Sequence, residues 1–89
     1  QVGVARYVIN PDGKSCEFAI VVSDKLQHQG IGTRLMKALF NAARQHGMSV
    51  MEGTVLKNNG GMLKLMSDLG FSTRMDPDDP ELVIVERWL

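Results

Sequence analysis

Apolar and polar positions alternate along the start of the chain in a pattern that predicts two strands. The stretch Gln1–Ile9 has a period of two, which is typical of a strand. Asn10-Pro11-Asp12-Gly13 has the composition of a turn, because proline fixes φ and Gly13 accepts a positive φ. Ser15–Val22 follows as the second strand of a hairpin. Its run Phe18–Val22 is entirely apolar, and we expect it to be buried on both faces.

Helical spacing replaces alternation further along the chain. Apolar side chains recur with a helical period from Thr33 to His46, and Gly47 follows as a natural stop. The apolar stripe consists of Leu35, Met36, Leu39, Phe40 and Ala43. After the polar break Lys57–Gly61, a shorter helix is predicted over Gly61–Leu69.

The remaining segments predict three more strands. They are Met48–Leu56, Phe71–Met75 and Leu82–Trp88, and the loop Asp76–Glu81 separates the last two. The order is therefore strand, strand, helix, strand, helix, strand, strand. The central strand–helix–strand unit makes its two strands parallel, and the flanking hairpins are antiparallel. We predict an α/β (α+β) fold with one mixed sheet and helices packed on it.

Composition limits the classes of partner. The chain has 89 residues, which is room for one domain, and we expect residues 1–89 to form it. Ten basic and ten acidic residues cancel, so charge gives no argument for nucleic acid or an anionic membrane. No apolar run reaches the length of a membrane span. A single cysteine, Cys16, cannot form an internal disulfide, which fits a cytoplasmic location.

One loop carries the chemistry. The apolar strand ending at Val22 runs into a polar loop with two glycines, Gly30 and Gly32, that opens into the first helix. Glycine lets a backbone approach a ligand closely, and the first turn of a helix offers unpaired N–H groups and a favourable dipole for an anion. The pattern therefore predicts an anion site.

The acidic loop Asp76–Glu81 lacks the glycine-centred spacing of a calcium loop, so we expect no metal.

The residues of this loop resemble a known family. Gln27-x-x-Gly30-x-Gly32, after an apolar strand and opening a helix, resembles the pyrophosphate loop of the GNAT acyl-CoA N-acyltransferases. A second block agrees, since Asn59 and the later Leu69-Gly70-Phe71 resemble another motif of that family. A glycine loop alone is a weak signal, whereas the two blocks in this order and spacing are a strong one.

The resemblance extends over essentially the whole chain but only part of the family's domain. The family's first strand, two helices and next strand have no counterpart, so we expect an N-terminally incomplete domain. A narrower resemblance, to the GNAT domain of bacterial protein lysine acetyltransferases, lies in Glu17–Ala19, Gly32–Met36 and Asn59–Leu63. That likeness implies a further partner, a large domain similar to an ADP-forming acyl-CoA synthetase in the full-length protein.

The resemblance implies roles for particular residues. Glu17 matches the glutamate that serves as general base in related enzymes, and we take it as the only carboxylate of the central apolar strands. It lies roughly 17 Å upstream of Val22, comparable to an extended pantetheine arm. The residues expected to bind acetyl-CoA are Ile20, Val21, Val22, Gln27, His28, Gln29, Gly30, Ile31, Gly32, Thr33 and Asn59.

Simpler interpretations stay open for several of these residues. Glu17 can face solvent on a half-exposed strand, and Asn59 can be the N-cap of a helix. Cys16 fits a small buried hydrophobe better than an acyl carrier. Met66 stands where many relatives have a tyrosine that protonates the departing thiolate. Tyr7 is a substitute for that acid, although a core tyrosine is the simpler reading.

The sequence thus predicts an N-acetyltransferase that uses acetyl-CoA as co-substrate. The expected acceptor is a protein lysine, which attacks the thioester directly with Glu17 as the base. One alternative is a small-molecule amine acetyltransferase of the same fold. Another is a regulatory domain that binds acyl-CoA without turnover.

Overall fold

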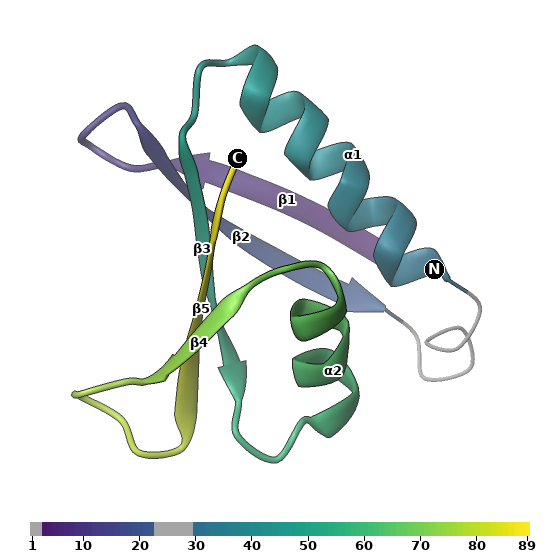
Figure 1. Cartoon of the computed structure of the whole chain (residues 1–89), viewed down its shortest axis with the longest axis vertical. Helices are drawn as coiled ribbons and strands as arrows, with labels where there is room; N and C mark the ends of the chain where they lie inside the picture. The colour runs from purple at the N-terminus through teal and green to yellow at the C-terminus, as the bar shows by residue number, and fades with distance from the viewer. Residues whose placement is uncertain (1–2, 23–29) are drawn as a thin grey trace.

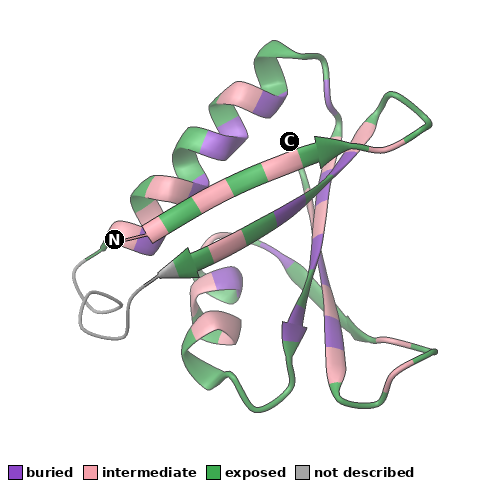
Figure 2. Ribbon diagram, turned by 180° about the vertical axis from the view of Figure 1, so that it is seen from behind, coloured by how far each residue is buried: buried purple, intermediate pink, exposed green. Residues whose placement is uncertain are grey.

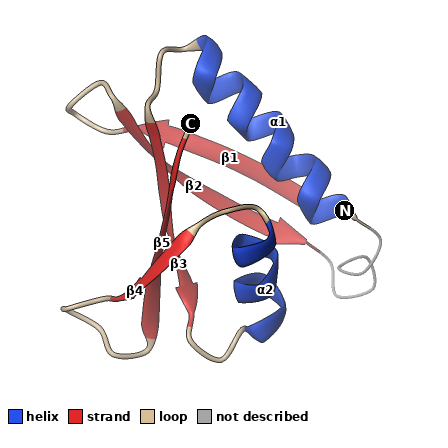
Figure 3. Cartoon of the chain, viewed as in Figure 1, coloured by secondary structure: helices blue, strands red, loops and turns tan. Residues whose placement is uncertain are grey.

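The computed structural model describes residues 3–22 and 30–89. These residues form five strands and two helices in the predicted order, which Figure 3 colours by type. Their bounds are β1 (Gly3–Ile9), β2 (Ser15–Val22), α1 (Ile31–Gln45), β3 (Val50–Leu56), α2 (Gly60–Asp68), β4 (Ser72–Met75) and β5 (Leu82–Trp88). Two strands, β2 and β5, have the predicted bounds, and the ends of the other elements lie within two residues of the predicted ones. The predicted strand residues Gln1 and Val2 lie outside the described residues.

The strands form one mixed sheet in the order β1-β2-β3-β5-β4 (Figure 1). β2 and β3, joined through α1, are parallel, and the β1/β2 and β4/β5 hairpins are antiparallel. These pairings confirm the predicted mixed sheet. β5 lies between β3 and β4 and pairs with β3 along the whole of both strands.

β2 and β3 form a fork. Their parallel register covers only Ser15–Glu17 against Val50–Glu52. Beyond that point the two strands diverge, as Figure 1 shows. The rest of β2, Phe18–Val22, keeps its partner β1 on one edge. Its other edge has no strand partner among the described residues.

One prediction about β2 is wrong. Its apolar run is not buried on both faces, because burial alternates along the strand: Phe18 is buried, Ala19 is exposed, and Val21 is 71% exposed. The buried side chains of α1 and α2 belong to the core on the face of Phe18, which we call the inner face. Figure 2 shows the opposite, outer face of β1 and β2, where every second residue is exposed.

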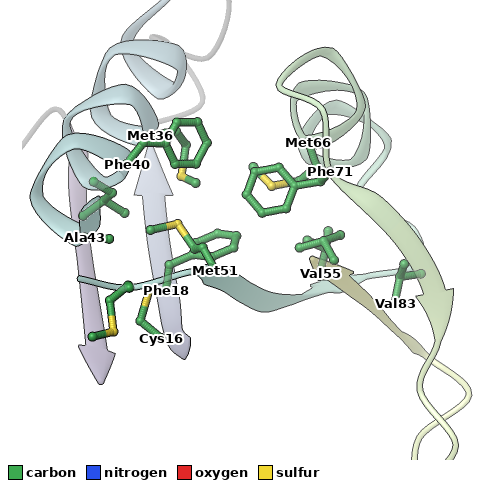
Figure 4. Close-up of a cluster of buried hydrophobic side chains, with 13 residues drawn as sticks. Cys16, Phe18, Met36, Phe40, Ala43, Met51, Val55, Met66, Phe71 and Val83 are labelled. Atoms are coloured by element: carbon green, nitrogen blue, oxygen red, sulfur yellow. The ribbon is translucent and has the colours of Figure 1, made fainter. Parts of the chain in front are cut away.

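Methionine and phenylalanine fill most of the core between the inner face and the helices (Figure 4). The Phe71 ring centroid lies 5.5 Å from that of Phe18 on β2 and 5.9 Å from that of Phe40 on α1. Cys16 is completely buried, and its thiol donates a hydrogen bond to the Val50 carbonyl at 3.6 Å. Burial, followed by the negative charge of Glu52, raises the pKa of this thiol. Cys16 is therefore a core residue and not an exposed acyl carrier.

The fork opens where a phenylalanine meets a glycine. The ring of Phe18, the first residue of β2 beyond the paired register, lies against Gly53, the first such residue of β3. A Cβ atom on Gly53 would lie 2.6 Å from Phe18 Cε1. Only glycine leaves room for the ring at this position.

Candidate active site

Glu17 lies at the apex of the fork. It is the last residue of β2 in register with β3, and its side chain is exposed on the outer face. There it lines a hollow of about 480 Å³. The other lining residues are Arg6, Val8, Asn10, Phe18 and Ala19. Glu17 is thus exposed to solvent, and its carboxylate belongs to the lining of this hollow.

Sequence reasoning missed two further carboxylates in the central strands, so the statement that Glu17 is the only one there is wrong. Glu52 on β3 is in register with Glu17, and Glu86 on β5 is in register with Glu52. Both are half-buried. The cross-strand register places Glu52 beside Glu17 and Glu86 beside Glu52. The sequence signal was an acidic residue in each of two largely apolar strands.

The turn before β2 holds Glu52 in place. Asn10 Nδ2 donates hydrogen bonds to Glu52 Oε1 at 3.1 Å and to Ser15 Oγ at 2.8 Å. Asp12 in turn accepts from the backbone N–H groups of Lys14 and Ser15 at 2.8 and 2.9 Å. These hydrogen bonds, with one from the Ser15 hydroxyl, lower the pKa of Asp12. The predicted turn therefore also positions a carboxylate.

The residues whose backbone is predicted to contact the cofactor lie along the open edge of β2. Ile20, Val21 and Val22 pair with β1 at Ala5, Val4 and Gly3, and the register with β3 ends before them. Successive peptide groups of a strand point to alternate edges, so some of their N–H and C=O groups face into the fork. An extended chain of amides could pair with this edge as another strand would.

The start of α1 lies beside the end of β2. A Cβ on Gly3 would lie 3.4 Å from the Val21 carbonyl oxygen and 3.6 Å from Ile31 Cγ2, so these segments are neighbours. Gly30 is the N-cap, and its φ of 76° is in the left-handed region that favours glycine. α1 therefore begins at Ile31, two residues before the predicted Thr33.

Three N–H groups at the start of α1 have no partner within the helix. They belong to Ile31, Gly32 and Thr33, because the first helical bond is from Arg34 N to Gly30 O at 3.1 Å. The first turn contains no acidic residue. This end of α1 therefore suits an anion. The other predicted loop residues, Gln27, His28 and Gln29, lie outside the described residues.

Asn59 is the N-cap of α2. Its side chain accepts a hydrogen bond from Met62 N at 3.2 Å. This confirms the capping interpretation, and it leaves the side-chain NH₂ group available to a ligand. Since α2 follows β3, this cap lies beyond the end of the second arm of the fork.

The position of the relatives' tyrosine acid holds Met66, which has no proton to donate, and the substitute Tyr7 projects from the opposite face of the sheet to Glu17. Met66 is completely buried in the core. The Tyr7 hydroxyl is 3.0 Å from Nδ1 of His46, at the C-terminal end of α1 on the inner face, whereas Glu17 projects from the outer face. Tyr7 therefore acts as an amphipathic core residue that ties β1 to α1.

In residues 3–22 and 30–89, no group of histidine, cysteine, aspartate or glutamate side chains is arranged to hold a metal ion. Neither described helix is long and apolar enough to cross a membrane.

Known structures share this architecture. The GNAT domain of PAT from S. lividans superposes with a TM-score of 0.87 at 25% identity, over 99% of this chain and 54% of that one. The structure of yncA from Salmonella typhimurium, which holds its cofactor acetyl-CoA, superposes with a TM-score of 0.78 at 24% identity, over 99% of this chain and 57% of that one.

Sequence comparison gives the family. A Pseudomonas aeruginosa protein named acetyltransferase PA5475 is 34% identical over 84 residues, which are 94% of this chain and 45% of the relative. The chain thus spans about half the length of these relatives. The family model described as "Acetyltransferase (GNAT) family" matches residues 1–71. The chain therefore belongs to the GNAT acetyltransferase family, whose fold uses acetyl-CoA as co-substrate.

Proposed function

We propose that this chain binds acetyl-CoA and takes part in transfer of its acetyl group to an amine. The observation that carries this proposal is the fork between β2 and β3, with the anion-ready start of α1 at the end of one arm. Acetyl-CoA is an anion at its pyrophosphate end and an extended diamide along its pantetheine arm. Both features match what this site offers.

In this proposal the cofactor lies along β2. The pyrophosphate is held by N–H groups at Gly30, Ile31, Gly32 and Thr33, by the Thr33 hydroxyl and by the loop residues Gln27, His28 and Gln29. The pantetheine amides pair with the backbone of Ile20, Val21 and Val22. Asn59 contributes its free NH₂ group. The thioester then lies near the apex of the fork, beside Glu17.

Glu17 serves as general base, directly or through a water. An amine such as lysine has a pKa of about 10.4, so holding it neutral at pH 7 costs about 4.6 kcal/mol, and a base at the site lowers that barrier. No acid is assigned to the leaving group. A thiol has a pKa of about 8.5, so water can protonate the thiolate.

The expected acceptor is a protein lysine side chain, and the runner-up acceptor is a small-molecule amine. The resemblance of the sequence to the GNAT domain of bacterial protein lysine acetyltransferases supports a protein acceptor. By the same resemblance, we propose a cytoplasmic protein in which this domain accompanies an acyl-CoA synthetase-like domain. A non-catalytic acyl-CoA sensor is the rival function, and the buried Met66 in place of a tyrosine acid favours it.

Glu17→Gln separates an enzyme from a sensor. We expect this variant to lose acetyl transfer by about 100-fold or more while its acetyl-CoA affinity stays within two-fold of the parent, because general bases contribute about 10²–10⁴-fold. Glu81→Gln is the matched control, since Glu81 is an exposed carboxylate in the β4–β5 loop. If the chain binds acetyl-CoA but Glu17→Gln has the same turnover as Glu81→Gln, Glu17 is not the base. Binding without turnover by the parent would favour the sensor.

A further inference from the structure

The hollow on the outer face contains a positive charge as well as the carboxylate of Glu17. Arg6 on β1 lines it, and the Arg6 side chain is exposed. In the antiparallel register of β1 and β2, Arg6 is opposite Ala19 and Val8 is opposite Glu17. Arg6 and Glu17 are therefore diagonal neighbours on the same face, at a separation of about 7–8 Å. The hollow thus has one group of each charge.

The sizes of four side chains explain why the sheet is concave here. The two long side chains, Arg6 and Glu17, occupy one diagonal of the cross-strand block, and the shorter Val8 and Ala19 occupy the other. Val8 and Ala19 therefore form a low apolar floor between two charged walls. Figure 2 shows this face of β1 and β2, where exposed residues alternate along both strands.

Arg6 and Glu17 do not neutralise each other. Within residues 3–22 and 30–89, the ion pair is Lys64–Asp68 on α2. The guanidinium of Arg6 is therefore available to a ligand in the hollow. Its planar arrangement of five N–H donors matches a carboxylate, which it binds through two parallel hydrogen bonds.

We propose that Arg6 is a specificity-determining residue for the acceptor, because it binds a carboxylate that the acceptor carries near its amine. The inference rests on the proposed acetyl transfer with Glu17 as base. An amine that reaches Glu17 from the outer face places the rest of the acceptor over the apolar floor, next to Arg6. Acceptors that lack a negative charge close to the amine are therefore bound more weakly.

The exposure of the hollow favours a peptide as the source of this carboxylate. Val8 is 66% exposed, and Arg6, Glu17 and Ala19 are exposed as well. Sites for small molecules enclose most of the surface of their ligand, whereas an open hollow suits an extended segment that buries only part of its length. The acceptor of this proposal is thus a lysine with an aspartate or glutamate beside it in the sequence.

Two peptides that differ only in charge test the role of Arg6 without turnover. The ¹⁵N-labelled chain, saturated with CoA, is titrated with acetyl-Asp-Lys-Asp-amide and with acetyl-Asn-Lys-Asn-amide. We expect the Asp peptide to bind about ten-fold more tightly and to shift the amide signals of Arg6 and Ala19. Arg6→Gln should lose this preference. Arg6→Lys, which keeps the charge without the planar donor arrangement, should retain part of it.

Arg74→Gln is the matched control. Arg74 is also an exposed arginine, but it is on β4 at the opposite edge of the sheet. Both variants change the net charge of the chain equally, so a general attraction for the acidic peptide would weaken by the same amount in each. We expect Arg74→Gln to keep the full preference for the Asp peptide.

Several results would overturn the inference. They are equal binding of the two peptides, no binding of either, an unchanged preference in Arg6→Gln, or the same loss of preference in Arg74→Gln. Titration of free lysine against lysinamide tests the other source of a carboxylate. A preference for free lysine that depends on Arg6, with none between the peptides, would assign the site to an amino acid and overturn the peptide acceptor.

Two further measurements keep the outcomes distinct. Arg6 is exposed, so circular dichroism should show that Arg6→Gln and Arg6→Lys are folded. Titration of acetyl-CoA alone separates the two proposals, because a folded chain that does not bind it would refute the proposed function itself. A chain that binds acetyl-CoA and does not distinguish the two peptides would refute only the role of Arg6.

Discussion

The aromatic ring of Phe18 covers the backbone of Gly53 at the point where β2 and β3 part. The two residues follow directly after the paired glutamates Glu17 and Glu52, so this contact sets where the fork begins. The Phe71 ring packs against the Phe18 ring, with their centroids 5.5 Å apart. It therefore limits how far the Phe18 ring can move away from Gly53.

Gly53→Ala should therefore destabilise the fold. Its Cβ would lie 2.6 Å from Cε1 and 2.9 Å from Cζ of Phe18, so the ring or the strand must move. We expect a loss of about 1–3 kcal/mol in the free energy of unfolding, measured by urea titration. Gly60→Ala is the control, because a Cβ there meets nothing within 4 Å and the position is helical. Equal stability of the two variants would show that the ring does not need Gly53.

Gly30→Ala should reduce both stability and acetyl-CoA affinity. The positive φ of 76° costs an alanine about 1–3 kcal/mol, and relaxing it would turn the first N–H groups of α1 away from the anion. Gly13→Ala is matched, since Gly13 has a φ of 69° and equally open surroundings but lies in the β1–β2 turn. It should lose stability and keep its affinity in calorimetric titration. A similar loss of affinity in both variants would contradict a ligand role for the start of α1.

Asn59 should contribute to both helix capping and ligand binding. Asn59→Ala removes the acceptor for Met62 N and should cost about 1 kcal/mol of unfolding free energy. Asn59→Asp keeps a capping oxygen but replaces the NH₂ donor with negative charge. We expect it to retain stability in thermal unfolding and to bind acetyl-CoA more weakly. If Asn59→Asp binds like the parent, Asn59 is a cap and nothing more.

The Asp12 turn should make stability depend on acid pH. Hydrogen bonds from Lys14 N, Ser15 N and the Ser15 hydroxyl lower the pKa of Asp12 below its ordinary value of 3.8. A lowered pKa in the folded state contributes stability that is present above the ordinary pKa and is lost as pH falls through the folded one. Asp12→Asn should therefore be less stable than the parent at pH 6, and the difference should shrink below about pH 3.

Asp68→Asn is the control for this pH series. Asp68 also accepts a hydrogen bond, from Lys64 at 3.1 Å, but both side chains are largely exposed and such pairs contribute little. Urea titrations of both variants at the two pH values check the prediction. A difference between Asp12→Asn and the parent that persists unchanged at low pH would mean that the charge of Asp12 is not what stabilises the turn.

Local patterns predicted most of the architecture. Alternation and helical spacing depend only on neighbouring residues, and they predicted every described helix and strand. The strand–helix–strand order then predicted that β2 and β3 are parallel. Val21 was predicted to be buried, whereas it is exposed in the structure. An apolar run alone does not reveal which face of the sheet the helices cover. The fork was not foreseen, since the end of a register depends on a contact between distant residues, Phe18 and Gly53.

The candidate site was predicted only in part, for the same reason. Gly30 and the start of α1 were found because a glycine loop and a helix start leave a local signal. Glu52 was missed because its position beside Glu17 arises from cross-strand register, which the local sequence does not contain. Its hydrogen bond to Asn10 joins residues 42 positions apart in the chain.

Calorimetric titration of acetyl-CoA into the folded chain tests the central claim, that the β2/β3 fork and the start of α1 form a cofactor site. We expect saturable binding at a single site, weakened by about ten-fold in Gly30→Ala and unchanged in Gly13→Ala. Absence of binding by a chain that circular dichroism shows to be folded would contradict the claim.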